Sequence, residues 1–394
     1  MRQNSPVERD PVTVLENIRE ISKTFALNRN ERQRRRELHR EDFDLLRDAG
    51  FLLCAVPEDK GGFYQDVRRS TRWVCEMLRA LAHGDSSVAL VASMHPAVIL
   101  SGGWPQIEEA PEPFTEAWSW QRDWVFETAR DGHWWGTIIS EPGSGGDPSK
   151  TRATARLGES DGQYLLSGQK HFGSGAGNSS FMITLAIPEG ETGPDLFLMD
   201  MRDVPWDGSA GVKLAAAWDG HGMTATQSHA MTFEDMPAVR AAWPGAERLF
   251  QREDMGRPTG HLFTAVMVGI VETAIETARA YLDGKRDSMR PYEQVEWTRV
   301  EMEGWLIEQA YEGVLREVEN GDNGPRSSLL CKEVVAELAE TVLTRISKVV
   351  GGSSYSRHAP YGYWFEDVRA LGFLRPPWGF AFDNIFGGSW TSGV

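Results

Sequence analysis

The sequence has few cysteines and no excess of positive charge. Each of these shortages excludes some classes of site or binding partner. Its three cysteines, Cys54, Cys75 and Cys331, are odd in number and lack a metal-binding spacing, so we expect reduced, buried thiols. Lys and Arg total 41 against 57 Asp and Glu, a formal charge of -16 that repels nucleic acid and anionic membranes. The densest basic run, 29–40, is interspersed with glutamate and is interpreted as a solvated helix face.

Long apolar segments and nucleotide-binding signatures are also scarce. The N-terminal segment has no apolar core of a signal peptide, and no run is expected to be long enough to span a bilayer. Neither G-x-G-x-x-G after a strand nor G-x-x-x-x-G-K-[ST] occurs, so Rossmann and P-loop sites lack support. We therefore expect a cytoplasmic protein with no nucleic-acid or membrane partner and no metal site.

The spacing of apolar residues divides the chain into three regions. Residues 1–130 and 246–394 have the stripes of amphipathic helices. Residues 131–245 contain short apolar runs separated by Gly, Pro, Asp and Ser, which is typical of an antiparallel β-domain, and Asp161-Gly162 marks a hairpin turn within it. The predicted fold class is therefore α+β, mostly α, with a small β-domain between two helical regions.

Two glycine-rich turns in the middle region offer a surface for a flat ligand. The turns are IISEPGSGGD at 138–147 and GQKHFGSGAG at 168–177, and each follows a predicted strand. Their hydroxyls and main-chain N–H groups can bind the edge of a polar heterocycle, and Phe172 can cover its face. Glycine is needed wherever the backbone touches a ligand without a Cβ between them. Taken singly, each turn is equally a tight hairpin loop without a ligand.

Four motifs in the right order resemble those of the acyl-CoA dehydrogenase superfamily, and the resemblance covers nearly the whole chain. The matching stretches are SEPGSGGD at 140–147, GQKHFGSG at 168–175, FEDMPAV at 233–239 and GGSSYSRHAP at 351–360. The resemblance implies an N-terminal helical domain, a central β-barrel-like domain and a C-terminal four-helix bundle. It also implies a flavin, usually FAD, in a homotetramer or homodimer.

Carried over position by position, the resemblance implies a flavin site. Ile139 and Ser140 lie at the flavin ring, Gly145 lies close to it, Phe172 replaces the tryptophan that covers the ring, and Ser174 replaces the threonine near N5. Gly351 and Gly352 match glycines that approach the FAD of a neighbouring subunit. Lys285, with Arg286 beside it, falls where the family has the arginine that binds FAD phosphate. The rest of that motif is missing, which makes FMN or a weakly bound reduced flavin an alternative to FAD.

The glutamate base of the family dehydrogenases has no counterpart at either of its usual positions. Counting from Pro360 reaches Arg375, and the second position falls near Thr259. Arginine cannot accept a proton near neutral pH and supplies only fixed positive charge. A displaced base remains open, and its candidates are Glu253, Asp254, Glu366 and Asp367. Arg375 itself is either a substrate-binding cation or a structural partner of Glu366 or Asp367.

Three functions follow from these residues. The leading interpretation is an FAD-dependent dehydrogenase that desaturates a bulky or atypical acyl-CoA with a displaced base and passes electrons to a protein partner. The first alternative is a monooxygenase that takes reduced flavin from a reductase and hydroxylates an aromatic or heteroatom substrate. WDGHGMTATQSH at 218–229 resembles that branch. The second alternative is a non-catalytic scaffold.

Further residues are expected to border the substrate. Gly146, His221 and Trp378 are the predicted substrate contacts. His229 is either a proton shuttle or a structural imidazole. Three more tryptophans, Trp134, Trp135 and Trp364, either line an aromatic pocket or belong to the core.

Overall fold

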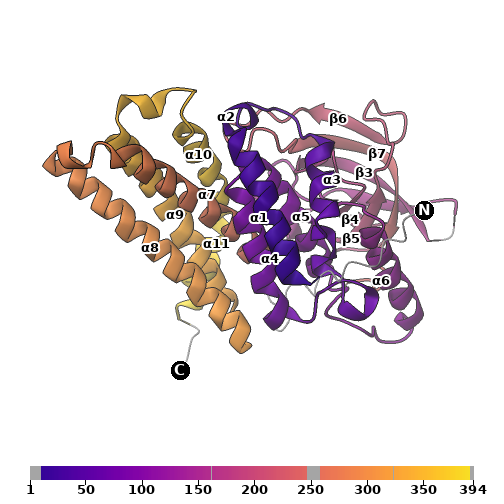
Figure 1. Ribbon diagram of the computed structural model, residues 1–394. Helices are drawn as coiled ribbons and strands as arrows, with labels where there is room; N and C mark the ends of the chain where they lie inside the picture. Colours follow the sequence, from indigo (N-terminus) through magenta and orange to yellow (C-terminus); the bar gives the residue numbers. More distant parts are fainter. Residues whose placement is uncertain (1–9, 161, 246–257, 323, 391–394) are drawn as a thin grey trace, which may run out of the picture.

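The N-terminal region is helical in the computed structural model, which describes residues 10–160, 162–245, 258–322 and 324–390 (Figure 1). Its helices are α1 Pro11–Leu27, α2 Arg29–Arg32, α3 Arg40–Asp48, α4 Val67–Ala82, α5 Ser86–Ser101 and α6 Thr115–Arg130. Helix α5 is apolar on all sides and buried from Ser86 to Leu100. Asp85 caps it by accepting the N–H of Val88 at 2.9 Å. Such a helix is expected at the centre of a core rather than at its edge.

The basic run at 29–40 is only partly a solvated face, and the interpretation is wrong for Arg32. Its guanidinium donates to Asp42 at 3.0 and 2.8 Å and to Asp85 at 2.7 Å, and its side chain is buried. An arginine reaches such a site only when carboxylates come with it. The two aspartates belong to other segments, so the run itself did not reveal them.

The central region is a sheet closed into a small barrel. Its strands are β1 Trp135–Thr137, β2 Thr154–Leu157, β3 Gln163–Gly173, β4 Phe181–Pro188, β5 Asp195–Asp200, β6 Val212–Ala216 and β7 His229–Arg240. The order is β1-β4-β2-β3-β7-β5, and a further β4–β5 pairing closes the ring. Strands β2 and β3 form the expected hairpin, with Thr154 opposite Ser167. A second core fills the barrel, built around Phe197, Phe233 and Met231.

Two strand pairs correct the expectation of a wholly antiparallel domain. Strands β1 and β2 both run parallel to β4. The chain leaves β1 at Thr137, makes the glycine-rich turn at 138–147, and returns as β2 farther along the same edge of β4, where β1 pairs with residues 181–183 and β2 with residues 187–188. Strands that run in the same direction cannot be joined by a tight hairpin. The turn at 138–147 is therefore part of a long connection that brings the chain back along this edge of β4.

The C-terminal region is a helical bundle. Its helices are α7 Pro258–Asp283, α8 Pro291–Asn320, α9 Pro325–Val350, α10 Tyr361–Val368 and α11 Trp378–Gly388. Arg72 of α4 pairs with Glu312 of α8 at 2.9 Å, and Arg79 of α4 pairs with Glu272 of α7, so the N-terminal helices are tied to the bundle. In Figure 1, α7 lies between α4 and the other bundle helices.

Helix α7 departs from the expectation that no segment is long and apolar enough to span a membrane. By length and composition Gly260–Asp283 passes that test, but 78% of its most apolar window is buried in the protein. Its apolarity is therefore accounted for by its place between α4 and α9. The cysteines behave as expected, since all three are free and buried.

Candidate active site

The turn at 138–147 is held in place by hydrogen bonds to three consecutive carbonyls. The hydroxyl of Thr184 donates to the carbonyl of Ile138 at 2.6 Å. Lys170 Nζ lies 3.4 Å from the carbonyl of Ile139. The backbone N–H of His171 donates to the carbonyl of Ser140 at 2.7 Å. Strands β3 and β4 thus fix the start of the turn, where the resemblance puts the flavin ring.

A buried ion pair anchors the same turn. Lys170 Nζ donates to Glu141 at 2.7 Å and to the carbonyl of Leu185 at 2.6 Å. The other acceptor sites of Glu141 take the N–H groups of Arg152 and Ala153, at 2.8 and 3.1 Å. Burial would raise the pKa of Glu141, but Lys170 and the two N–H groups hold it below its ordinary value. A buried pair with these additional hydrogen bonds is a rigid support for the turn.

Gly145 and Gly146 both have a positive φ, which favours glycine, but the surroundings of an added Cβ differ between them. Gly145 has φ +63° and is exposed, and a Cβ added there would meet no atom within 4 Å. Gly146 has φ +80°, and a Cβ there would lie 2.7 Å from Cγ of Pro377. The C-terminal segment therefore packs against the backbone at Gly146 and leaves no room for a side chain. Gly145 keeps the open approach that a flat ligand requires.

Phe172 and Ser174 lie at the end of β3 as the resemblance implies. Phe172 has φ +59°, an unfavourable conformation for an aromatic residue, and its ring is 59% exposed. The edge of Trp218 contacts it, with ring centroids 6.2 Å apart. Ser174 is buried, and its hydroxyl joins a chain that runs through Ser228 at 2.8 Å and Thr226 at 2.7 Å. Its oxygen can therefore donate or accept a hydrogen bond at the site.

Arg375 reaches the same turn from the C-terminal segment. It donates to the hydroxyl of Ser140 at 3.0 Å and lies 3.4 Å from the carbonyl of Gly146. Within the described residues no carboxylate lies within ion-pair distance of it. Burial without a compensating charge lowers the pKa of Arg375 to about 10. The expected structural pairing with Glu366 or Asp367 is absent.

The two described candidates for a displaced base have other partners. Glu366 pairs with Arg369 at 2.8 Å on the surface of α10. Asp367 is buried; one oxygen accepts the hydroxyl of Ser86 at 2.5 Å and the other the N–H of Met223 at 2.6 Å. Glu253 and Asp254 lie outside the described residues. Neither described carboxylate contacts the turn at 138–147.

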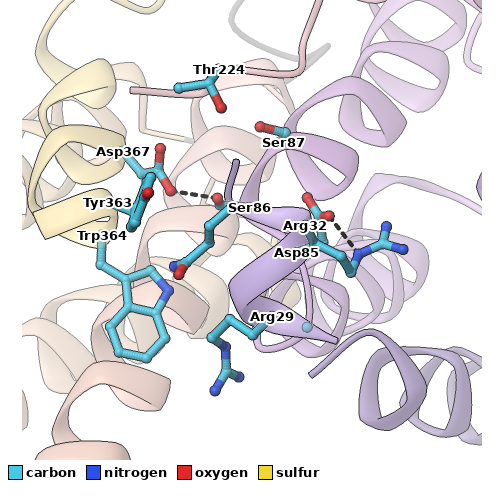
Figure 2. Close-up of a pocket in the computed structure, with 11 residues that line it drawn as sticks. Arg29, Arg32, Asp85, Ser86, Ser87, Thr224, Tyr363, Trp364 and Asp367 are labelled. Carbon is cyan, nitrogen blue, oxygen red and sulfur yellow. Dashed lines mark hydrogen bonds and ion pairs between the residues drawn. The ribbon is translucent and has the colours of Figure 1, made fainter. Parts of the chain in front are cut away.

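Asp367 faces a different cavity, drawn in Figure 2. Arg29, Arg32, Asp85, Ser86 and Trp364 line this cavity with it, between α2, the start of α5 and α10. The enclosed space is about 10 Å³, which holds one water molecule at most. The cavity is therefore a small polar junction between these helices and too small for a flavin or a substrate.

Asp367 gives the fold a predictable pH dependence. Burial raises its pKa to about 6, with Asp85 and Glu366 adding repulsion. Because the folded state holds the proton more tightly, this group stabilises the fold fully below about pH 4 and the contribution is lost as pH rises to about 6. We expect D367N to remove a component of about 3 kcal/mol from the change in unfolding free energy between pH 4 and 7. Denaturant titrations at each pH measure it, with E366Q as the control that retains the component; parallel curves for D367N and the parent would contradict this account.

The remaining predicted substrate contacts do not gather at the turn. His221 is exposed on the loop after Gly220. Trp378 begins α11 and is 57% exposed, with its ring edge on Phe382. His229 is structural, because its Nδ1 accepts the N–H of Trp218 at 2.9 Å and burial lowers its pKa. Trp134, Trp135 and Trp364 are buried core residues.

The residues assigned to a neighbouring subunit's flavin do lie together. Lys285 Nζ donates to the hydroxyl of Tyr281 at 2.8 Å, and that hydroxyl lies 3.2 Å from Ser353 Oγ. Ser353 directly follows Gly351 and Gly352, where an added Cβ would meet nothing within 4 Å. Arg286 is exposed beside Asp287. This surface can approach a phosphate, with a lysine as the point charge.

Several functional residues escaped the sequence analysis. Trp218 and Ser228 lie beside Phe172 and Ser174 but come from the loop before β7. The signal for both was the stretch 218–229, which pointed to a branch of the superfamily and to no particular contact. His171 Nε2, one residue before Phe172, is buried and has no hydrogen-bond partner in the described part of the chain. A buried ring nitrogen without a hydrogen-bond partner, beside the turn, marks a place where a ligand atom can bind.

The assembled residues fit a flavin. Hydroxyls of Ser140 and Ser174, the open backbone of Gly145 and the exposed ring of Phe172 surround one end of the barrel. This set supplies hydrogen bonds for a polar ring edge and an aromatic cover for its face. Within the described residues, no group of three His, Cys, Asp or Glu could hold a metal ion.

Comparison with known proteins supports this assignment. Residues 136–236 match the family model "Acyl-CoA dehydrogenase, middle domain". The chain is 28% identical over 288 residues to "Probable FMNH2-dependent monooxygenase SfnC" of Pseudomonas putida, covering 71% of this chain and 64% of that one. It is 27% identical over 305 residues to a dibenzothiophene monooxygenase of Rhodococcus erythropolis, covering 74% and 66%. The matched regions thus span about two thirds of these relatives' length.

A solved structure shows the same architecture over the full length. The crystal structure of FMN-bound TdsC from Paenibacillus sp. A11-2 matches with a TM-score of 0.79 and 19% identity, covering 97% of this chain and 98% of that one. At that identity the match establishes the fold alone. The expected architecture of helical domain, barrel-like domain and helical bundle is confirmed. The expected resemblance to the acyl-CoA dehydrogenase superfamily is thus confirmed, in the middle domain by the family model and over the whole chain by the fold.

Proposed function

We propose that this protein is a monooxygenase that uses reduced flavin to oxygenate a small organic substrate. The observation that carries the proposal is the position of Arg375. It occupies the place of the dehydrogenase base and bonds to Ser140, while Glu366 and Asp367 are engaged elsewhere. A guanidinium cannot remove the α-proton that desaturation requires.

The relatives support the same choice. The names of SfnC and of the dibenzothiophene enzyme both denote monooxygenases. The leading expectation, FAD-dependent desaturation of an acyl-CoA with a displaced base, is supported less well than its monooxygenase alternative. The scaffold alternative gives no reason for an open Gly145 beside an exposed and strained Phe172.

The proposed cofactor is FMN rather than FAD. The SfnC name specifies FMNH2, and the TdsC structure holds FMN. The partner is then a flavin reductase. We retain the cytoplasm and a homo-oligomer as proposals; exposed Met302, Trp305 and Leu306 on α8 are apolar surface that a second copy can cover.

The residues of the candidate site have separate roles at a bound flavin ring. When bound, reduced flavin supplies the electrons that activate dioxygen. Ser140 and Ser174 orient the polar edge of the ring, and Ser174 can exchange a proton along its hydroxyl chain. Phe172, backed by Trp218, covers the ring face and excludes water. Glu141 and Lys170 keep the turn in the binding geometry.

Anaerobic visible spectroscopy tests the proposal. Titration with reduced FMN should show saturable binding that is tighter than the binding of FAD. A panel of acyl-CoA esters should leave the spectrum of the protein loaded with oxidised FMN unchanged, because neither Arg375 nor the engaged carboxylates of Glu366 and Asp367 removes the α-proton. Bleaching by any one thioester would contradict the proposal and return the dehydrogenase interpretation to first place.

A further inference from the structure

The guanidinium of Arg375 lies against the turn at 138–147 and has no carboxylate partner among the described residues. Arg32 and Arg240 have such partners, Asp42 and Asp85 for Arg32 and Asp195 for Arg240, whereas Arg29 donates to the carbonyl of His83 and lies over the ring of Trp364. Arg375 has only the hydroxyl of Ser140 and the carbonyl of Gly146, among the described residues. An uncompensated charge in such a place is costly unless something else neutralises it.

The nearest acid on the turn cannot supply the missing charge. Glu141 is already neutralised by Lys170 and accepts two backbone N–H groups. Arg375 even repels Lys170, which contributes to the lowered pKa of that lysine after burial itself. The site therefore carries an excess of positive charge on a chain whose formal charge is -16. With the carboxylates of the described residues accounted for, an anion from solution is the proposed source of compensation.

The geometry leaves room for an anion with two oxygens. A guanidinium has five N–H donors, and two of those on Arg375 are engaged. Because Ser140 Oγ accepts from Arg375, its own hydrogen is available to a ligand. A planar fork with free donors matches the two oxygens of a carboxylate. Pro377 packs against Gly146, so the segment that carries Arg375 is held against the turn.

We propose that Arg375, positioned by Ser140, binds the carboxylate of a small organic acid, which is the substrate class of this enzyme. The position favours the substrate over the cofactor, because the family places its dehydrogenase base there, next to the reacting part of the substrate. The inference that the bound carboxylate belongs to the substrate rests on the proposed function. The competing anion is the negative charge of the reduced flavin, and the experiment separates the two.

The test compares benzoate with benzamide, its neutral counterpart, on the FMN-loaded protein in the absence of turnover. Titration calorimetry should show benzoate binding at least tenfold more tightly than benzamide. R375M should abolish the preference, and R375K should keep part of it because the charge remains while the fork is lost. The matched control is R369M, which removes a nearby arginine that already has Glu366 as its partner. It should leave the preference intact.

Two further readouts keep the proposal open to disproof. R375M should unfold at the same temperature as the parent or higher, because an unpaired charge is removed, and the reduction potential of the bound FMN is measured alongside. Equal binding of benzoate and benzamide by the parent overturns the proposal. The proposal is also overturned if R375M makes the reduction potential of the bound FMN more negative and leaves the benzoate preference unchanged. That result would show that the positive charge of Arg375 compensates the reduced flavin. If benzoate is preferred but no oxygenated product forms with reduced FMN and dioxygen, the anion site stands and the proposed oxygenation fails alone.

Discussion

Replacing Lys170 by methionine is expected to lower the free energy of unfolding by about 3–5 kcal/mol, because it leaves the buried carboxylate of Glu141 without its cation. The side chains of Lys170 and Glu141 are 0% and 4% exposed, so water cannot take over the solvation of the remaining charge. The carbonyl of Leu185 also loses its donor. Urea titration at neutral pH measures the effect, and weaker reduced-FMN binding should accompany it because the turn at 138–147 is released.

A neighbouring cation provides the control for this variant. Arg152 lies 3.6 Å from the same carboxylate, but its side chain is 70% exposed. R152M should therefore cost less than about 1 kcal/mol. The double variant E141L/K170M should cost clearly less than the sum of its single changes, since it leaves no charge unpaired. A K170M effect as small as that of R152M would show that the pair does not anchor the turn.

The substitution G145A is expected to weaken reduced-FMN binding at least tenfold while the protein remains folded. The added Cβ meets no protein atom within 4 Å and projects where the ring edge is proposed to lie. Gly143 is a matched control on the same turn. It has φ +76°, close to the +63° of Gly145, and it also has open space around an added Cβ.

The comparison of the two glycine variants isolates ligand contact from backbone strain. Both alanines pay a similar conformational cost, of about 1–2 kcal/mol. G143A should therefore lose stability as G145A does and yet bind reduced FMN as the parent does. Anaerobic fluorescence titration gives the affinities. Equal losses of affinity would place the ring elsewhere.

Local patterns in the sequence were sufficient for the elements and for half of the site. The helical stripes of the C-terminal region and the hairpin between β2 and β3 depend on residues close in the chain, and they are found as predicted. The second glycine-rich stretch differs from its prediction, because residues 168–173 belong to strand β3, and the turn at 138–147 pairs with this strand at Ser140 and His171. Period and turn chemistry encode such features directly.

Features that depend on distant partners were not predictable from the sequence. Arg375 and Ser140 are 235 positions apart, so nothing near Arg375 revealed that it reaches the turn. Arg32 was taken for a surface residue because its partner Asp85 belongs to another helix. Asp367 was a candidate base by position, and only the structure shows that Ser86 and Met223 occupy its oxygens. Charge and burial become informative when the contacts are known.

The most direct test of the central claim is incorporation of labelled oxygen. The protein, FMN, NADH and a flavin reductase are incubated under ¹⁸O₂ with a panel of anionic and neutral aromatic and sulfur compounds, and the products are analysed by mass spectrometry. The account predicts at least one product that gains a single ¹⁸O atom only when the protein and reduced FMN are both present. Conversion of an acyl-CoA to its unsaturated product, with no label in any compound of the panel, would contradict it.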